Sequence, residues 1–359
     1  MNSSKEILFV AGARPNFIKI APLLQAMKAY PRLSPYFVHT GQHYDEKLCH
    51  WIFEDLKLPS PDVNLDVGSG SHGEQTAKVM ERLEKILLMR KPHLVVVVGD
   101  VNSTLAGSLT AVKLHIPVAH VEAGLRSGDR AMPEEINRIV TDSVSDYLFT
   151  HSKEADKNLL QEGIPKEKII FVGNVMIDTL KQMLPKALEF PPLTDEHYGL
   201  VTLHRPSNVD QPKILKGIFS ALAKISKFLP LYFPVHPRTA LRLKHFNILP
   251  QEKGFHMIEP LSYLPFLGAM AKAKLVLTDS GGIQEETTVL SIPCLTLRKN
   301  SERMVTVSNG TNKIVGENPK KIVLAAKVAL KFKKIGHSCP ELWDGKASER
   351  IVQFIASKI

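Results

Sequence analysis

The sequence has few cysteines, few aromatic residues and no long apolar run. Its three cysteines, Cys49, Cys294 and Cys339, form no C-x-x-C pair, which argues against a disulfide framework and fits a reducing cytoplasm. No apolar run approaches the roughly 20 residues that a membrane span needs. The first residues also lack the layout of a signal peptide. We therefore expect a cytoplasmic protein with no membrane partner.

The sequence likewise lacks the signatures of nucleic-acid and metal binding. The net charge is +10, but the excess lies in dispersed lysines rather than in arginine and aromatic patches, so we expect no nucleic-acid partner. There is no acidic triplet, so no metal site is expected. A basic protein attracts anionic small molecules, and this is the partner class that the charge favours.

The chain contains strand-like and helix-like segments in alternation, a pattern typical of parallel sheets flanked by helices. Its 359 residues allow two domains. The alternation of strand-like and helix-like segments is interrupted at residues 189–196, which contain a proline pair, and it resumes after them. We predict an α/β fold with two doubly wound Rossmann-like domains, residues 1–185 and 196–345, and a cleft between them. The last helix, within residues 346–359, is expected to pack back on the first domain.

Residues 118–138 are the most informative stretch. A strand predicted over residues 116–121 ends in Glu122, and a helix is predicted to start at Pro133 with Glu134 and Glu135. Chemistry in open α/β sheets sits beyond the carboxyl ends of the strands. Asp100 ends another apolar strand in the same way. These carboxylates suggest acid/base work, although Glu135 could serve only as a helix-start residue.

Histidines end two strands of the second half. His204 and His236 are therefore acid/base candidates, although each could equally be a structural hydrogen-bonding group.

Two strand-to-helix turns have the composition of phosphate sites. Arg14 and Lys19 flank the first turn and could face a phosphate or be plain surface cations. Residues 279–286, DSGGIQEE, offer glycines and a helix N-terminus to a pyrophosphate. The alternative is that Glu285 and Glu286 lie in the first helical turn and serve the helix dipole. The G-x-G-x-x-G of residues 68–73 follows no apolar strand, so it predicts a loop before a helix rather than a dinucleotide site.

Taken in order, ten segments resemble the non-hydrolysing UDP-N-acetylglucosamine 2-epimerases. They are GARPNFIKIAPL, TGQHYDE, VVGDVNSTLAG, IPVAHVEAGLRSGDRAMPEEINR, VGNVMIDTL, VTLHRPSN, PVHP, LSYLPF, LTDSGGIQEET and SERMVTVSNGT. The resemblance implies the GT-B type of fold, a homodimer, a UDP-sugar substrate, and no metal or nicotinamide cofactor.

The resemblance also implies a set of site residues. The catalytic positions are Asp100, Glu122, Glu134 and His204. The implied substrate-binding positions are Arg14, Lys19, Arg126, Arg138, Arg205, His236, Phe266, Ser280, Gly281, Gly282, Glu286 and Arg303. Some members bind a second UDP-N-acetylglucosamine as an activator, and Gln42, Arg205 and His236 could line such a site. This chain departs from the family pattern at Pro206 and Ser207, which puts that regulation in doubt.

The implied function is reversible epimerisation at C2 of UDP-N-acetylglucosamine to UDP-N-acetylmannosamine. UDP leaves by anti elimination and re-adds to 2-acetamidoglucal, giving precursors for surface polysaccharides. A hydrolysing epimerase that releases N-acetylmannosamine and UDP, or a GT-B glycosyltransferase, are the alternatives. The exact UDP-sugar, with a diacetamido uronic acid as a variant, and the assignment of base and acid remain open at this point.

Overall fold

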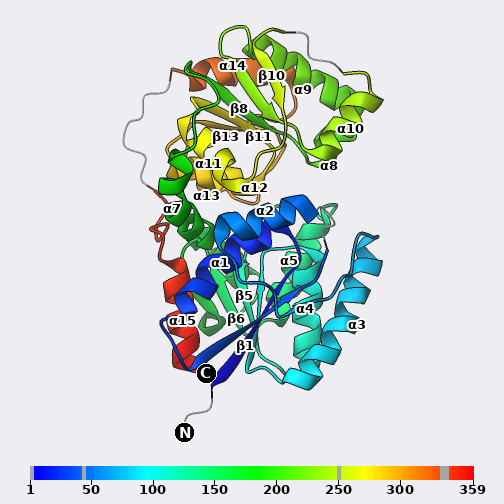
Figure 1. The fold of residues 1–359 in the computed structure, drawn as a ribbon, viewed down its shortest axis with the longest axis vertical. Helices are drawn as coiled ribbons and strands as arrows, with labels where there is room; N and C mark the ends of the chain where they lie inside the picture. The colour runs from blue at the N-terminus through cyan, green and yellow to red at the C-terminus, as the bar shows by residue number, and fades with distance from the viewer. Residues whose placement is uncertain (1–3, 43–45, 249–251, 332–338) are drawn as a thin grey trace. The chain divides into compact units, whose positions relative to one another are not determined.

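The computed structural model describes residues 4–42, 46–248, 252–331 and 339–359. The chain divides into two compact units (Figure 1). Unit 1 comprises Met1–Gln182 and Glu341–Ile359, and unit 2 comprises Met183–Pro340. Residues 43–45, within the TGQHYDE segment, lie outside the described residues.

Unit 1 is built on a seven-stranded parallel sheet with the strand order β3-β2-β1-β4-β5-β6-β7. Its strands are β1 (Lys5–Ala11), β2 (Leu33–His39), β3 (Val63–Asn64), β4 (Leu94–Val98), β5 (Val118–Ala123), β6 (Tyr147–Thr150) and β7 (Ile169–Phe171). All five residues of β4 are buried, as expected for a central strand covered by helices on both faces.

The helices of unit 1 cover both faces of this sheet. They are α1 (Arg14–Met27), α2 (Glu46–Leu56), α3 (His72–Arg90), α4 (Asn102–Lys113), α5 (Pro133–Val144), α6 (Lys153–Gln161), the short η1 (Lys166–Lys168) and α15 (Ala347–Lys358), and α7 (Val175–Leu188) runs across the boundary into unit 2. Helix α4 packs between α3 and α5, whereas α15 packs against α1 (Figure 1). Phe354 of α15 makes edge contacts with Tyr147 and Phe149, which anchors this last helix on β6.

Unit 2 repeats the plan with a six-stranded parallel sheet in the order β10-β9-β8-β11-β12-β13. Its strands are β8 (Gly199–Thr202), β9 (Leu231–Pro234), β10 (Phe255–Ile258), β11 (Leu275–Thr278), β12 (Cys294–Thr296) and β13 (Asn312–Ile314). Its helices are α8 (Pro206–Val209), α9 (Pro212–Ile225), α10 (Pro237–His245), α11 (Tyr263–Lys272), α12 (Gly281–Val289), α13 (Val305–Ser308) and α14 (Pro319–Ala329). The core of this unit is aliphatic and phenylalanine-rich, and α9 packs against α14 over it.

Each sheet reverses its strand order at one point, between β1 and β4 in unit 1 and between β8 and β11 in unit 2. Such switch points are where ligands bind in open α/β sheets. The predicted doubly wound α/β fold is confirmed. The predicted strand at residues 116–121 is displaced, because β5 runs over Val118–Ala123 and so includes Glu122. No helix in the described ranges combines the length and apolarity needed to cross a bilayer.

The G-x-G-x-x-G segment lies where a loop passes into a helix, as predicted. Helix α3 begins at His72, inside the motif, and the Ser71 hydroxyl caps it by accepting the N–H of Glu74 at 3.3 Å. A serine N-cap of this kind is a common way to start a helix.

Candidate active site

The turn between β1 and α1 is held by Asn16. Its side-chain oxygen accepts the backbone N–H groups of Gly12 and Ala13, and its amide donates to the carbonyl of Val98 at 2.9 Å. A side chain at Gly12 has no room, since its Cβ would lie 2.2 Å from the Ser103 hydroxyl. This packing brings the start of α1 close to the end of β4, and Arg14 begins the helix as an exposed cation.

Glu122 lies in the most constrained backbone of unit 1. Its φ is +74°, and the pairing of β5 with β6 shifts register between Val121 and Ala123. A non-glycine residue in this region is strained, and such strain persists where the surroundings enforce it. Glu122 is buried and forms an ion pair with buried Lys19. The surface-cation alternative for Lys19 is therefore wrong, and its phosphate role stays a prediction.

Gly99 provides the space for this ion pair. It has a φ of +70°, and a Cβ there would lie 2.8 Å from the Lys19 ammonium and 3.4 Å from the Glu122 carboxylate. A buried carboxylate is tolerated when a cation compensates it, and Lys19 is placed to do so for Glu122 at the strand end.

Asp100 follows β4 and is partly exposed. Its carboxylate accepts from the guanidinium of Arg138, which is fully buried and also binds Glu135. Glu135 in turn accepts the N–H groups of Ser127 and Gly128. Burial alone would raise the pKa of Glu135, but the N–H of Ser127 and the Arg138 guanidinium lower it. Glu135 is therefore a structural anion, and Arg138 orients Asp100.

Glu134 lies in the first turn of α5 and is half-buried, whereas neighbouring Glu135 is buried. The predicted helix start at Pro133 is confirmed. The two adjacent glutamates therefore differ in role. Glu135 supports the loop at Ser127 and Gly128, whereas Glu134 remains the candidate for proton transfer.

Arg126 is engaged by carboxylates of its own unit. It binds Asp142 at 2.8 Å and both oxygens of Glu162 at 2.6 Å, and its side chain is mostly buried. Arg126 is thus held by carboxylates of unit 1, and its substrate-binding role stays a prediction. The side chain of Gln42 is also hydrogen-bonded within unit 1, because its oxygen accepts the hydroxyl of Ser103 at 2.6 Å.

Unit 2 has an anion at its own switch point. Asp279 follows β11, is fully buried, and accepts the backbone N–H groups of His204 and Arg205 and the amide of Asn208. The His204 ring nitrogen Nδ1 lies 3.1 Å from the same carboxylate. Burial alone would raise the pKa of Asp279, but the charge of His204 and these hydrogen bonds lower it. The partly exposed imidazole is thus held against a buried carboxylate.

His236 stands close to His204 and starts a helix. The two ring centroids are 5.8 Å apart. His236 is the N-cap of α10, where its Nδ1 accepts the N–H of Arg238 at 3.2 Å. Since Nδ1 is an acceptor here, Nε2 carries the proton of the neutral ring.

The DSGGIQEE turn presents a helix N-terminus. Helix α12 begins at Gly281 with Ser280 as N-cap and has no acidic residue in its first turn. The helix-dipole interpretation of Glu285 and Glu286 is therefore wrong, because both lie in the second turn. Glu286 is buried and accepts the hydroxyl of Tyr263 at 3.0 Å.

Buried arginines pack behind this helix start. Glu302 binds Arg298 at 2.8 Å and Arg303 at 2.5 Å, and Arg205 lies 3.9 Å away. Burial alone would raise the pKa of Glu302, but the charges of Arg303, Arg298 and Arg205 hold it far below its usual range. Glu302 was not among the predicted site residues, although in the sequence it lies between Arg298 and Arg303. Phe266, another predicted site residue, is half-buried in α11.

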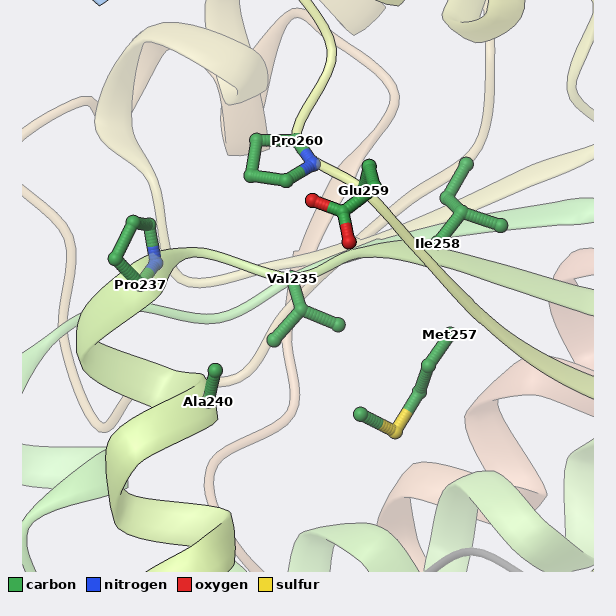
Figure 2. A pocket seen from close by; sticks show the side chains of 7 residues that line it. All are labelled: Val235, Pro237, Ala240, Met257, Ile258, Glu259 and Pro260. Carbon is green, nitrogen blue, oxygen red and sulfur yellow. The ribbon is translucent and has the colours of Figure 1, made fainter.

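A cavity of about 460 Å³ opens at the carboxyl ends of β9 and β10 in unit 2. It is lined by Val235, Pro237, Ala240, Met257, Ile258, Glu259 and Pro260. Figure 2 shows α10 on one side, residues 257–260 on the other and the Glu259 carboxylate between them. Six of its seven lining residues are apolar, and Glu259 is the charged one. None of the predicted site residues lines it.

Among the described residues, no group of three histidine, cysteine or acidic side chains is placed to hold a metal ion.

Replacing Gly281 by alanine is expected to disturb this turn. The new Cβ would lie 2.6 Å from the Arg303 guanidinium and 2.8 Å from Glu302, both buried, so overpacking should cost about 1–3 kcal/mol of unfolding free energy. Urea unfolding measures the loss. Gly73→Ala in α3 is the matched control, since nothing lies within 4 Å of its Cβ. Equal stability of Gly281→Ala and the wild type would contradict the close packing.

A family model described as UDP-N-acetylglucosamine 2-epimerase matches residues 25–356. A curated protein of that name from Methanocaldococcus jannaschii is 45% identical, with 98% of each chain covered. The UDP-2,3-diacetamido-2,3-dideoxy-D-glucuronate 2-epimerase of Pseudomonas aeruginosa is 41% identical, covering 98% of this chain and 99% of that protein.

The solved structures agree with the sequence matches. The crystal structure of the Methanocaldococcus jannaschii UDP-GlcNAc 2-epimerase with UDP-GlcNAc and UDP has a TM-score of 0.92, at 44% identity over 98% of this chain and 99% of that one. The two Rossmann-like units are thus of the GT-B type, as predicted. By sequence and by fold, this chain belongs to the UDP-N-acetylglucosamine 2-epimerase family.

Proposed function

We propose that this chain interconverts UDP-N-acetylglucosamine and UDP-N-acetylmannosamine without net hydrolysis. The observation that carries the proposal is Glu122, which has a strained backbone and is buried in an ion pair with Lys19 on the strand next to β4, the strand that Asp100 follows. A carboxylate held in this way suits proton transfer at a weakly acidic carbon. The relatives named for this reaction cover nearly the whole chain.

The reaction is an elimination followed by an addition. A carboxylate takes the proton from C2, the C–H electron pair forms a C1–C2 double bond, and the C1–O bond breaks with its electrons passing to UDP. Re-addition of the UDP oxygen at C1, with a proton delivered to the opposite face of C2, gives the epimer. The same two bonds form and break in both directions, so no oxidant or reductant is needed.

In this proposal unit 1 supplies the C2 chemistry. Glu122, Asp100 and half-buried Glu134 are the proton-transfer candidates, and Arg138 holds Asp100 in place. The ion pair with Lys19 favours the carboxylate form of Glu122, which makes Glu122 our choice as the base for one face.

Unit 2 is proposed to recognise UDP. The helix N-terminus at Gly281 and Gly282, after the N-cap Ser280, offers N–H groups to a diphosphate, and Arg303 packs behind it. Glu286 is proposed to accept ribose hydroxyls. Its carboxylate also accepts the hydroxyl of Tyr263, which orients it. His204, held by Asp279, is proposed to stabilise the leaving diphosphate.

Proton NMR of the reaction in D₂O tests the proposal. UDP-N-acetylglucosamine should give UDP-N-acetylmannosamine with deuterium at C2, because the abstracted proton exchanges with solvent. A product without deuterium would contradict the elimination. Steady release of free UDP with N-acetylmannosamine would instead identify the hydrolysing reaction.

A parallel incubation with the diacetamido glucuronate nucleotide addresses the substrate. The Pseudomonas aeruginosa relative named for that sugar is 41% identical to this chain. The nucleotide with the higher kcat/KM is the better substrate of this enzyme. The homodimer implied by the resemblance stays a prediction, which light scattering of the purified protein tests.

A further inference from the structure

We propose that His120 and Asp142 form a positioning pair that fixes the backbone on both sides of Glu122 and just before Asp100. The inference rests on the proposed function, because it assigns these two side chains to the geometry of the same proton-transfer site. Both are buried, with side-chain exposures of 0% and 1%, so neither reaches a substrate.

His120 joins the two strands that carry the candidate carboxylates. It lies on β5 two residues before Glu122 and pairs with Val97 of β4. Its Nε2 lies 2.8 Å from the carbonyl of Gly99, the residue before Asp100, and its Nδ1 lies 2.6 Å from Asp142. The two ring nitrogens therefore each face an oxygen, one from Gly99 after β4 and one from Asp142 of α5.

Asp142 fixes the backbone on the C-terminal side of Glu122. Its second oxygen accepts the N–H of Gly124 at 3.1 Å and the guanidinium of Arg126 at 2.8 Å. Burial alone would raise the pKa of Asp142, but the charges of His120 and Arg126 and their hydrogen bonds lower it. The lowered pKa favours the carboxylate form of Asp142, and hydrogen bonds to His120, Gly124 and Arg126 make the arrangement directional.

The backbone that this pair holds is unusual and needs support. Glu122 and Gly124 have φ values of +74° and +79° on either side of Ala123. A Cβ at Gly124 would lie 2.5 Å from the carbonyl of Ala155, so the strand end has no freedom to relax toward α6. Since a displacement of about 1 Å can cost about 100-fold in rate, loss of the pair should act on turnover.

The test uses Asp142→Asn and His120→Gln in the full chain. We expect kcat for epimerisation to fall about 100-fold, with KM and UDP affinity within about threefold of the wild type, because the UDP-binding residues lie in unit 2. Two variants are needed because either alone can destabilise the unit, and circular dichroism verifies folding of each.

Asp178→Asn is the matched control. Asp178 is also a buried carboxylate of unit 1 that accepts backbone N–H groups, from Ala347 and Ser348, but it is hydrogen-bonded to α15 rather than to β4 or β5. It should lose stability without losing kcat. A merely structural role of His120 and Asp142 would give that same pattern and would overturn the proposal.

Amide hydrogen exchange provides a readout that needs no activity. The N–H of Gly99 donates to Val121 at 3.0 Å, and that of Gly124 donates to Asp142. Both should exchange faster in Asp142→Asn than in the wild type and in Asp178→Asn. Unchanged exchange overturns the positioning pair. A wild-type protein that exchanges as expected but turns over no UDP-sugar overturns the proposed function instead, while the exchange result still decides the inference.

Discussion

Replacing Glu122 by glutamine is expected to lower kcat by about 10²- to 10⁴-fold, the usual contribution of a general acid or base. Glutamine keeps the size of the side chain but cannot take the C2 proton, and it leaves buried Lys19 without its anion. Deuterium incorporation at C2, followed by NMR, measures the proton transfer directly. UDP affinity, measured by calorimetry, should change by less than about threefold, because a ground-state contact is not removed.

The control for Glu122→Gln is Glu81→Gln in the same unit. Glu81 is exposed on α3 and pairs with Lys85 at 3.4 Å, and an exposed ion pair of this kind contributes little to stability. It should leave kcat and stability unchanged. Retention of more than about a tenth of the wild-type kcat by Glu122→Gln would rule it out as a proton-transfer group.

Replacing Asp279 by alanine is expected to destabilise unit 2 by at least about 3 kcal/mol. The backbone N–H groups of His204 and Arg205 and the amide of Asn208 would lose their acceptor, and each buried donor left unpaired costs about 1–3 kcal/mol. Urea unfolding measures the change. Asp195→Ala, at an exposed aspartate, is the control and should be neutral. A loss of unfolding free energy no larger than that of the control would contradict the role of Asp279 as the shared acceptor of these three donors.

Wild type and Asp279→Ala should also differ in how their unfolding free energies depend on pH. Because the pKa of Asp279 is lowered on folding, its contribution is complete above the unfolded value of about 3.9 and is lost as the pH falls through the folded value. The difference in unfolding free energy between wild type and Asp279→Ala should therefore be constant from pH 7 to pH 5 and shrink below about pH 4. A difference that grows on acidification would contradict the direction of the shift.

Local signals account for the elements that the sequence predicted well. The predicted helix start at Pro133 is confirmed, because proline is favoured in the first helical turn. The helix N-terminus predicted within residues 279–286 is also present, since α12 begins at Gly281. The apolar residues predicted the presence of β5, but they did not predict the residue at which it ends.

Within the candidate site, the sequence placed residue types at strand ends and could go no further. It predicted Lys19 as a phosphate ligand or a surface cation, whereas the structure buries it against Glu122, 103 positions away. It predicted Arg126 for the substrate but not its ion pairs with Asp142 and Glu162. Such partners depend on which strands become neighbours, and β4 lies beside β1 only because the strand order reverses there.

By itself, the sequence determined the α/β class, the two doubly wound sheets and the family, because these follow from local hydrophobic periodicity and from motifs of adjacent residues. Only the tertiary structure decided the electrostatics of the site. The positive φ of Glu122, its pairing with Lys19, and the hold of His120 and Asp142 on two strand ends all join residues far apart in the chain. The physical reason is that charge and hydrogen-bond partners in a buried site are set by strand order and register, which no local pattern encodes.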